Sequence, residues 1–270
     1  MKRIQTRFAY YQFLSLQDHA GGLRHLVTTR IGGCSKTPYN TLNLGLHVGD
    51  AAGDVIGNRE LVCAEIGYPL DAMVAMQQSH GARVRVIDAP DKGRGAREWG
   101  DGIEDTDGMI TGTPHVILAG MSADCGVSLL YDPNERVIGV VHSGWKGIVS
   151  GVLRNAVGTM VDVFCCRRDD ILACIAPTVC ERCYEVGEDL VAAFEGAFPG
   201  RIDSLLAKTE KGSRSINMVQ AMRMQFGDEG ILQDRIEAAP LCTACRSDEF
   251  YSYRREHKET GRFGLFAVLV

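Results

Sequence analysis

The sequence has no long hydrophobic run and no dense basic cluster. No window of about 18 apolar residues occurs, so no membrane-spanning helix is expected. Residues 1–22 begin with positive charge but lack the apolar stretch and cleavage site of a signal peptide. The net charge is −5 and the basic residues are dispersed, which argues against a nucleic-acid or membrane-surface partner. We therefore expect a cytoplasmic protein.

The chain also lacks internal repeats, low-complexity tracts and any clear linker between domains. Its 270 residues are 45% apolar, enough for a sizeable core. We therefore expect residues 1–270 to form a single domain. Ten cysteines without a secretion signal are better interpreted as reduced thiols, buried side chains or metal ligands than as a disulfide framework.

The stretch from residue 106 to residue 163 carries the clearest pattern. Three short runs rich in Val, Ile and Leu, at 116–121, 127–130 and 137–141, are bounded by turn residues and predict strands. Apolar residues at helical spacing then predict one helix over 148–164. Further strands are predicted at 23–30, 73–76, 84–87, 169–175 and 263–269, and further helices at 54–66, 188–198 and 216–226. Strands and helices without strict alternation favour one α/β or α+β domain.

Four residues that can carry chemistry lie at the edges of these strands. Asp124 and Cys125 fall between the first two runs, His142 follows the third, and His80 lies in the turn QQSHG. One thiolate and two imidazoles suit zinc and leave a fourth position open, the arrangement of a catalytic metal site. Their spacing matches no short metal motif, so two alternatives stay open. Cys125 could be a nucleophile with a histidine base, or a buried cysteine beside hydrogen-bonded histidines.

Two polar segments predict ligand contacts. In HSGWKG a strand, a glycine-flanked turn and a helix N-terminus would form an anion pocket, to which Lys146 adds charge. A tight turn without a ligand is equally compatible. In SYRRE, Tyr253 and Arg254 could clamp an anionic or planar ligand, and a solvated strand is the alternative.

Two CxxC pairs occur in the second half of the chain, Cys180 with Cys183 and Cys242 with Cys245. Residues 184–241 separate them, far more than a zinc ribbon contains. The spacing therefore argues against a zinc ribbon, and the roles of the two pairs stay open.

A set of ordered sequence segments is typical of one bacterial family. They are TTRIGG, NTLNLGLHVGD with VIGNRE, QQSHG, TDGMIT, ADC, HSGWKG, IAPTVCERCYEVG, CTAC with FYSYRR, and TGR. In this order they resemble the YfiH/YlmD-type purine nucleoside phosphorylases, also called multicopper polyphenol oxidoreductase or laccase-domain proteins. The resemblance extends from about residue 25 to residue 269.

The resemblance implies a layered α/β (α+β) sandwich with mixed β-sheets and a zinc ion held by His80, Cys125 and His142. It implies phosphorolysis of adenosine, inosine and S-methyl-5'-thioadenosine, with adenosine deamination as a further activity. Purine nucleoside and phosphate would be the ligands, and the protein would be a monomer or homodimer. Asp124 or His47 is the candidate proton donor, and the expected substrate-binding residues are Asn43, His47, Arg59, Lys146, Tyr253 and Arg254.

Departures from the family pattern and the laccase name also have chemical consequences. Lys146 replaces the usual Arg, which keeps the charge but loses bidentate phosphate recognition. The seven histidines include no His-x-His pair, so a multicopper site is not expected, although Cu²⁺ could replace Zn²⁺ in vitro. The alternative function is an amide hydrolase that edits cell-wall precursors through Cys125 or zinc, and it would not depend on phosphate.

Overall fold

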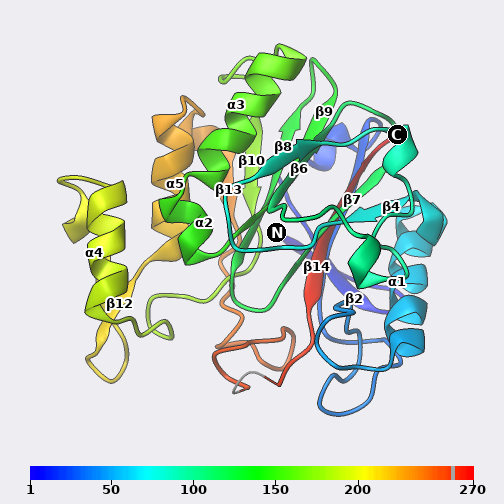
Figure 1. Cartoon of the computed structure of the whole chain (residues 1–270), viewed down its shortest axis with the longest axis horizontal. Helices are drawn as coiled ribbons and strands as arrows, with labels where there is room; N and C mark the ends of the chain where they lie inside the picture. Colours follow the sequence, from blue (N-terminus) through cyan, green and yellow to red (C-terminus); the bar gives the residue numbers. More distant parts are fainter. Residues whose placement is uncertain (257–258) are drawn as a thin grey trace.

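Two six-stranded sheets form the centre of the fold, and helices cover their outer faces (Figure 1). The computed structural model describes residues 1–256 and 259–270. The first sheet has the order β1 (Lys2–Gln5), β2 (Ala9–Gln12), β3 (Leu23–Thr28), β14 (Phe263–Leu269), β7 (Ile117–Ser122) and β4 (Met73–Ala75). The second has the order β13 (Ile236–Ala238), β10 (Leu172–Ile175), β8 (Gly126–Asp132), β9 (Val137–Ser143), β6 (Gly108–Thr111) and β5 (Val84–Val86). A hairpin of β11 (Leu206–Lys208) and β12 (Arg214–Ile216) is separate.

Both sheets contain parallel and antiparallel pairs, so the prediction of a layered sandwich with mixed sheets is confirmed. The central strands are buried on both faces. In β7, Leu118 points into the core between the sheets, whereas Ile117 and Ala119 pack on the opposite side. In β9, Val140 joins the inner core and Val141 the outer one. Burial on both faces explains why these strands are continuous apolar runs.

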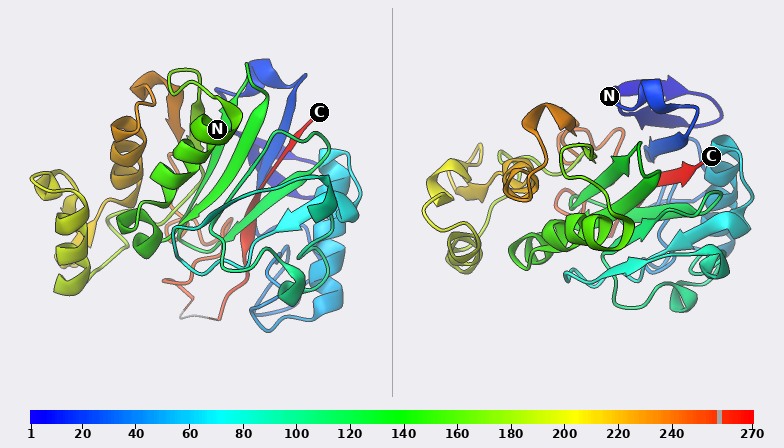
Figure 2. Two further views of the ribbon diagram at one scale, coloured as in Figure 1. Left: turned by 45° about the horizontal axis from the view of Figure 1, so that its top comes forward. Right: turned by 90° about the horizontal axis from the view of Figure 1, so that it is seen from above.

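The helices lie on opposite sides of the two sheets, as Figure 2 shows. Helix α1 (Ala52–Ile66) packs against the outer face of the first sheet. Helices α2 (Trp145–Val149), α3 (Val152–Phe164), α4 (Glu188–Ala197) and α5 (Met218–Asp228) belong to the apolar cluster on the outer face of the second sheet. None of the helices in the described residues is both long and apolar enough to cross a membrane.

The three apolar runs of the central stretch are confirmed as β7, β8 and β9, but two details differ. The single helix predicted over 148–164 is wrong, because Gly151 adopts a φ of 82° and separates α2 from α3. His142 lies inside β9 rather than after it, so the sheet itself holds its backbone.

Candidate active site and metal centre

His80, Cys125 and His142 come together at one end of the sandwich. His142 in β9 pairs with Val127 in β8, and Cys125 immediately precedes β8. His80 follows β4 in a turn where it adopts a φ of 61°. The ligand atoms of the three side chains lie within 4.8 Å of one another, and the two rings meet edge to face at 4.9 Å. We call this group the His80–Cys125–His142 centre.

Asp107, just before β6, orients both histidines. Its Oδ1 accepts a hydrogen bond from His142 Nδ1 at 2.8 Å and from the His80 backbone N–H at 3.1 Å. Its Oδ2 accepts hydrogen bonds from the Gly81 N–H and the Ser79 hydroxyl. With Nδ1 occupied by the carboxylate, His142 presents Nε2 to a ligand, as metal-binding histidines commonly do.

The electrostatics of the centre favour a thiolate. Burial alone would raise the pKa of the Cys125 thiol, but hydrogen bonds with His142 and His80 lower it to about 6. Burial would lower the pKa of His142, whereas its bonds to Asp107 and Cys125 raise it to about 9. Because the thiolate is both the metal ligand and the nucleophile, these shifts suit either role of Cys125.

Gly144 leaves the space that the centre needs. A Cβ atom at this position would lie 2.8 Å from His80 Cδ2 and 3.3 Å from Cys125 Sγ. The first glycine of the HSGWKG segment is therefore required, because the His80 and Cys125 side chains lie too close to its backbone for a larger residue. The donor set, the ligand-atom separations and this open space all fit a zinc ion.

A cavity of about 630 Å³ opens onto the centre, within the range of small-molecule sites. Eight residues predicted for the site line it: His47, Arg59, His80, Asp124, Cys125, His142, Tyr253 and Arg254. Trp99 and Tyr253 remain 45% and 44% exposed. Exposed aromatic rings beside a cavity provide surfaces on which a planar ligand can stack.

Arg262 and Arg254 bring positive charge to the cavity wall. Arg262 Nη1 donates hydrogen bonds to the Thr260 and Gly261 carbonyls. Within residues 1–256 and 259–270, its Nε and Nη2 have no hydrogen-bond partner. Arg254 lies over the ring of Tyr184 at 5.1 Å and donates to the Glu185 carbonyl. Arg262 therefore has N–H groups free to receive an anion.

Three residues predicted to bind substrate do not offer a free polar group to the cavity. Arg59 lines the cavity but donates its guanidinium hydrogens to the Leu44, Gly95 and Ala96 carbonyls. Asn43 is buried away from the cavity lining, and its Oδ1 accepts from the backbone N–H of Arg262. Lys146 is exposed, lies over Trp145 and is not part of the lining.

Asp124 joins the centre to two neighbouring loops. Burial raises the pKa of its carboxyl group, and hydrogen bonds from Thr243 and from the Arg254 N–H oppose that shift. These donors occupy both carboxylate oxygens, at 2.6 Å each. The backbone carbonyl of Asp124 accepts hydrogen bonds from the Thr178 hydroxyl and the Val179 N–H. Asp124 therefore fixes the chain next to Cys125.

Sequence reasoning did not assign Asp107, Arg262, Trp99, Tyr184 or Gln78 to the site, although all contact or line it. Asp107, Arg262 and Gln78 lie in TDGMIT, TGR and QQSHG. These segments belong to the family pattern and so marked the three positions. The role of each side chain, however, depends on which strands and loops lie next to it in the fold. Trp99 lies in a charged, glycine-rich segment that offered no such signal.

The remaining described histidines are dispersed. His19 packs against Tyr131, the His25 ring accepts a hydrogen bond from the Phe13 N–H, and His115 bonds to Tyr68. His257 lies outside the described residues. Among the described residues, the groups that could hold a metal are the His80–Cys125–His142 centre and a set of four cysteines, so these histidines do not assemble a trinuclear copper cluster.

The fold and the site define a class of two-sheet α/β proteins with an open Cys–His₂ centre beside an aromatic cavity. The chain belongs to the family described as "Multi-copper polyphenol oxidoreductase laccase", whose model matches residues 24–270.

Relatives and solved structures agree with this assignment. The purine nucleoside phosphorylase YlmD of Bacillus subtilis is 35% identical over 239 residues, 88% of this chain and 86% of the relative. The purine nucleoside phosphorylase SCO2081 of Streptomyces coelicolor is 36% identical over 94% of this chain and 98% of its own length. The crystal structure of YlmD from Geobacillus stearothermophilus superposes with a TM-score of 0.93 at 28% identity, covering 99% of this chain and 98% of that one.

Proposed function

We propose that the protein is a zinc-dependent purine nucleoside phosphorylase. It would convert adenosine, inosine or S-methyl-5'-thioadenosine and phosphate into the free base and the ribose 1-phosphate or its methylthio analogue. The observation that carries the proposal is the cavity in which a Cys–His₂ centre, aromatic rings and an arginine with free N–H groups meet. The names of the relatives in Bacillus and Streptomyces support it.

The aromatic side of the cavity suits a purine base. Trp99, Tyr253 and Tyr184 offer ring faces, and the His47 ring lies 6.1 Å from that of Trp99. Partial burial and the charges of Arg262 and Arg59 lower the pKa of His47 to about 4. Its imidazole is therefore neutral at pH 7 and can donate one N–H to the base. That hydrogen bond would stabilise the negative charge that develops as the base leaves.

Phosphate would bind to Arg262, because its Nε and Nη2 can form a bidentate pair with two phosphate oxygens. Arg254, on the same wall, would add charge. The bound phosphate would attack the ribose carbon while the stacked rings hold the base in place. Lys146 lies outside the lining, so we assign the phosphate to the arginines rather than to Lys146.

His80, Cys125 and His142 would hold the zinc ion, with Asp107 orienting His142. A zinc ion at such a site supplies a Lewis acid with one open coordination position. The raised pKa of Asp124 has the direction required of a general acid. Because both of its oxygens already accept hydrogen bonds, we assign it a positioning role.

Further properties belong to the same proposal. Adenosine deamination would take place in the same cavity, and Cu²⁺ could occupy the centre in vitro. All ten cysteines are free thiols, which fits a reducing compartment such as the cytoplasm.

The test is the release of hypoxanthine from inosine by purified protein, with and without phosphate, alongside the metal content by mass spectrometry. We expect release that requires phosphate, equimolar ribose 1-phosphate, and loss of both in Cys125→Ala. Cys165→Ala, which removes an exposed thiol, is the matched control. No base release from protein with a full zinc centre would overturn the proposal.

The second candidate is an amide hydrolase, favoured by the lowered pKa of the Cys125 thiol and its two histidine neighbours. It predicts turnover that is insensitive to phosphate. Assaying a panel of cell-wall peptides on the same preparation separates the two functions.

A further inference from the structure

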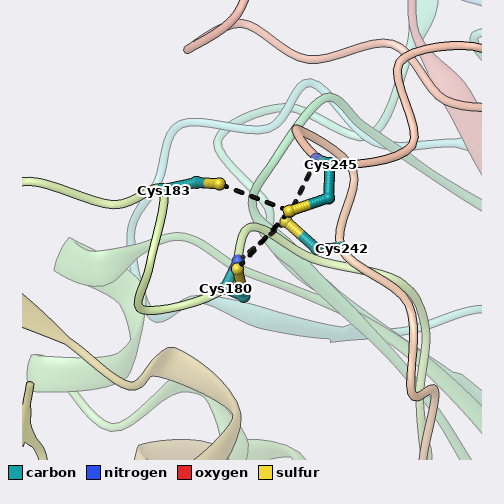
Figure 3. Close-up of side chains that lie close together, drawn as sticks. All are labelled: Cys180, Cys183, Cys242 and Cys245. Carbon is teal, nitrogen blue, oxygen red and sulfur yellow. Dashed lines mark hydrogen bonds between the residues drawn. The ribbon is translucent and has the colours of Figure 1, made fainter. Parts of the chain in front are cut away.

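Four cysteines form a second cluster outside the cavity lining, shown in Figure 3. Cys180 and Cys183 come from one loop, and Cys242 and Cys245 from another. The four Sγ atoms lie within 4.8 Å of one another. We call them the four-cysteine cluster. The long spacing argued against a site shared by both CxxC pairs, yet the fold brings the two pairs together.

The pairing of β10 with β13 brings the two loops together. These strands are parallel neighbours, with Ile175 opposite Ala238 at their ends. Because parallel strands end at the same edge of a sheet, the chain leaves both strands side by side. The loops stay adjacent through a bridge between Thr178 and Cys242. The intervening residues, which include α4 and α5, return the chain to this edge.

The sulfur separations fit a metal ion better than disulfides. Cys245 Sγ lies 3.5 Å from Cys183 Sγ and 3.9 Å from Cys180 Sγ. A disulfide needs about 2.05 Å. Tetrahedral zinc with Zn–S bonds of about 2.3 Å places its sulfurs about 3.8 Å apart. The observed spacing is thus that of ligands around one ion.

The backbone around the cluster is arranged to support a thiolate. The N–H groups of Cys180 and Cys245 donate hydrogen bonds to Cys242 Sγ, at 3.2 and 3.4 Å. Such backbone hydrogen bonds orient metal ligands and stabilise their negative charge. Cys242 is buried, so these two donors replace the water that its sulfur lacks.

Beside the cysteines the two loops have few apolar anchors, although the second loop also places Phe250 and Tyr251 in the core between the sheets. Residues 176–187 and 239–256 contain no helix or strand apart from isolated bridges. The apolar cluster that they share contains only Val179, Cys242 and Ala244 as buried members. So small a cluster stabilises weakly, whereas a bound metal adds its binding free energy to that of folding.

We propose that the four-cysteine cluster is a structural zinc site. Four thiolates close the coordination shell, which leaves no open position for a substrate. The site is distinct from the His80–Cys125–His142 centre and does not depend on the phosphorylase proposal.

The position of the cluster gives it a function in the cavity wall. Its two loops carry Thr178 and Thr243, which donate hydrogen bonds to Asp124, next to Cys125. They also carry Tyr184 and Arg254, which line the cavity. The zinc would therefore hold together the two loops that form one wall of the cavity. It would position Asp124 without touching substrate.

The first test compares metal content across variants purified under reducing conditions. Wild type should contain about two zinc ions per chain, Cys245→Ser and Cys125→Ala about one each, and the double variant none. The exposed-thiol control Cys165→Ser should match wild type. Cobalt substitution of Cys125→Ala should give the absorption of tetrahedral thiolate coordination. A Cys245→Ser protein with as much zinc as wild type would overturn the site, as would iron in place of zinc.

The second test is made on wild-type protein, so its result does not depend on whether a variant folds. Alkylation of wild-type protein, mapped by mass spectrometry with and without a zinc chelator, should modify the exposed Cys34 and Cys165 in both conditions. The exposed Cys245 should become reactive only after chelation. Reaction of Cys245 without chelator, or recovery of the cluster as disulfides from reduced protein, would contradict the proposal. Loss of activity in Cys125→Ala with this protection intact would separate the two sites.

Discussion

The two cysteine-containing clusters are built on different kinds of support. The His80–Cys125–His142 centre is held by β8, β9 and the buried Asp107. The four-cysteine cluster lies on two loops that follow β10 and β13, and few buried apolar residues surround the cysteines themselves. The first scaffold is made of paired strands, and its three ligands leave a fourth position open for chemistry. In our proposal the second scaffold depends on the metal as a crosslink, and its four thiolates close the coordination shell.

The largest effect should follow from removing Cys125. We expect Cys125→Ala to lower kcat/KM for phosphorolysis at least about 100-fold, because loss of a ligand exceeds loss of the partner that orients one. Loss of the bound metal lowers the melting temperature, but by less than in Cys245→Ser, because the paired strands β8 and β9 hold this centre without a crosslink. Steady-state kinetics and calorimetry measure both, with Cys165→Ala alongside. A large fall in melting temperature would show that this centre is structural as well.

Asp107→Asn should weaken the same centre without removing a ligand. The amide is nearly isosteric but cannot keep the carboxylate's charge beside His142. We expect a loss of roughly 10- to 100-fold in zinc affinity or activity, measured by competition with a chromophoric chelator and by kinetics. Unchanged zinc affinity would contradict the role that we assign to Asp107.

Arg262→Lys tests the cavity beside the centre. Lysine keeps the charge but loses the bidentate geometry, so KM for phosphate should rise about 10-fold, equivalent to one charged hydrogen bond. KM for inosine should change much less. Arg85→Lys, on the solvent side of β5, is the control. An equal rise in KM for phosphate and for inosine would show that Arg262 does not bind phosphate specifically.

Cys245→Ser should reverse the pattern of Cys125→Ala. Here we expect the melting temperature to fall by roughly 5–10 °C, since loss of a few kcal/mol shifts a chain of this size by about that much. Activity should fall less than about 10-fold, because no group that touches substrate is removed. A thermal scan with and without added zinc provides the measurement. An unchanged melting temperature would show that the loops need no crosslink.

His25 belongs to neither cluster. Its titration therefore makes the stability of the scaffold depend on pH independently of any acid release of metal. Burial lowers its pKa from 6.5 to about 4, against the opposing charge of Glu237. Between these values the unfolded chain binds a proton that the native chain does not, so stability falls as pH falls from 6.5 to 4. The loss approaches about 3 kcal/mol.

His25→Gln keeps an acceptor for the Phe13 N–H and should flatten that dependence while leaving activity at pH 7.5 unchanged. Denaturant unfolding at pH 7.5, 6 and 4.5 checks it. If the variant keeps the wild-type slope, other groups dominate the acid sensitivity.

Much of the central fold could be predicted from the sequence, and the structure brings together the three residues expected as metal ligands. Strands β7, β8 and β9 are apolar runs because both of their faces are buried. Cys125 immediately precedes β8, and His142 is the residue before the last of β9. The break at Gly151 was missed, because the apolar spacing continues across it. Asp107 and Arg262 were missed as well, since their partners come from β9 and from the loop that holds Asn43.

The four-cysteine cluster shows most clearly where local pattern stops being informative. Both pairs follow a short strand and an Ala-Pro dipeptide, at residues 176–177 and 239–240. That similarity between the two segments could have indicated that the pairs lie side by side, whereas their spacing along the chain argued against it. The three-residue β13 was too short to be noticed.

The sequence by itself determined the residue types, the buried strands and the chemistry of which a thiolate with two imidazoles is capable. Only the tertiary structure decided which cysteines meet. The parallel register of β10 and β13 joins segments about 60 residues apart, and such a register depends on the packing of the whole sheet rather than on the residues nearby.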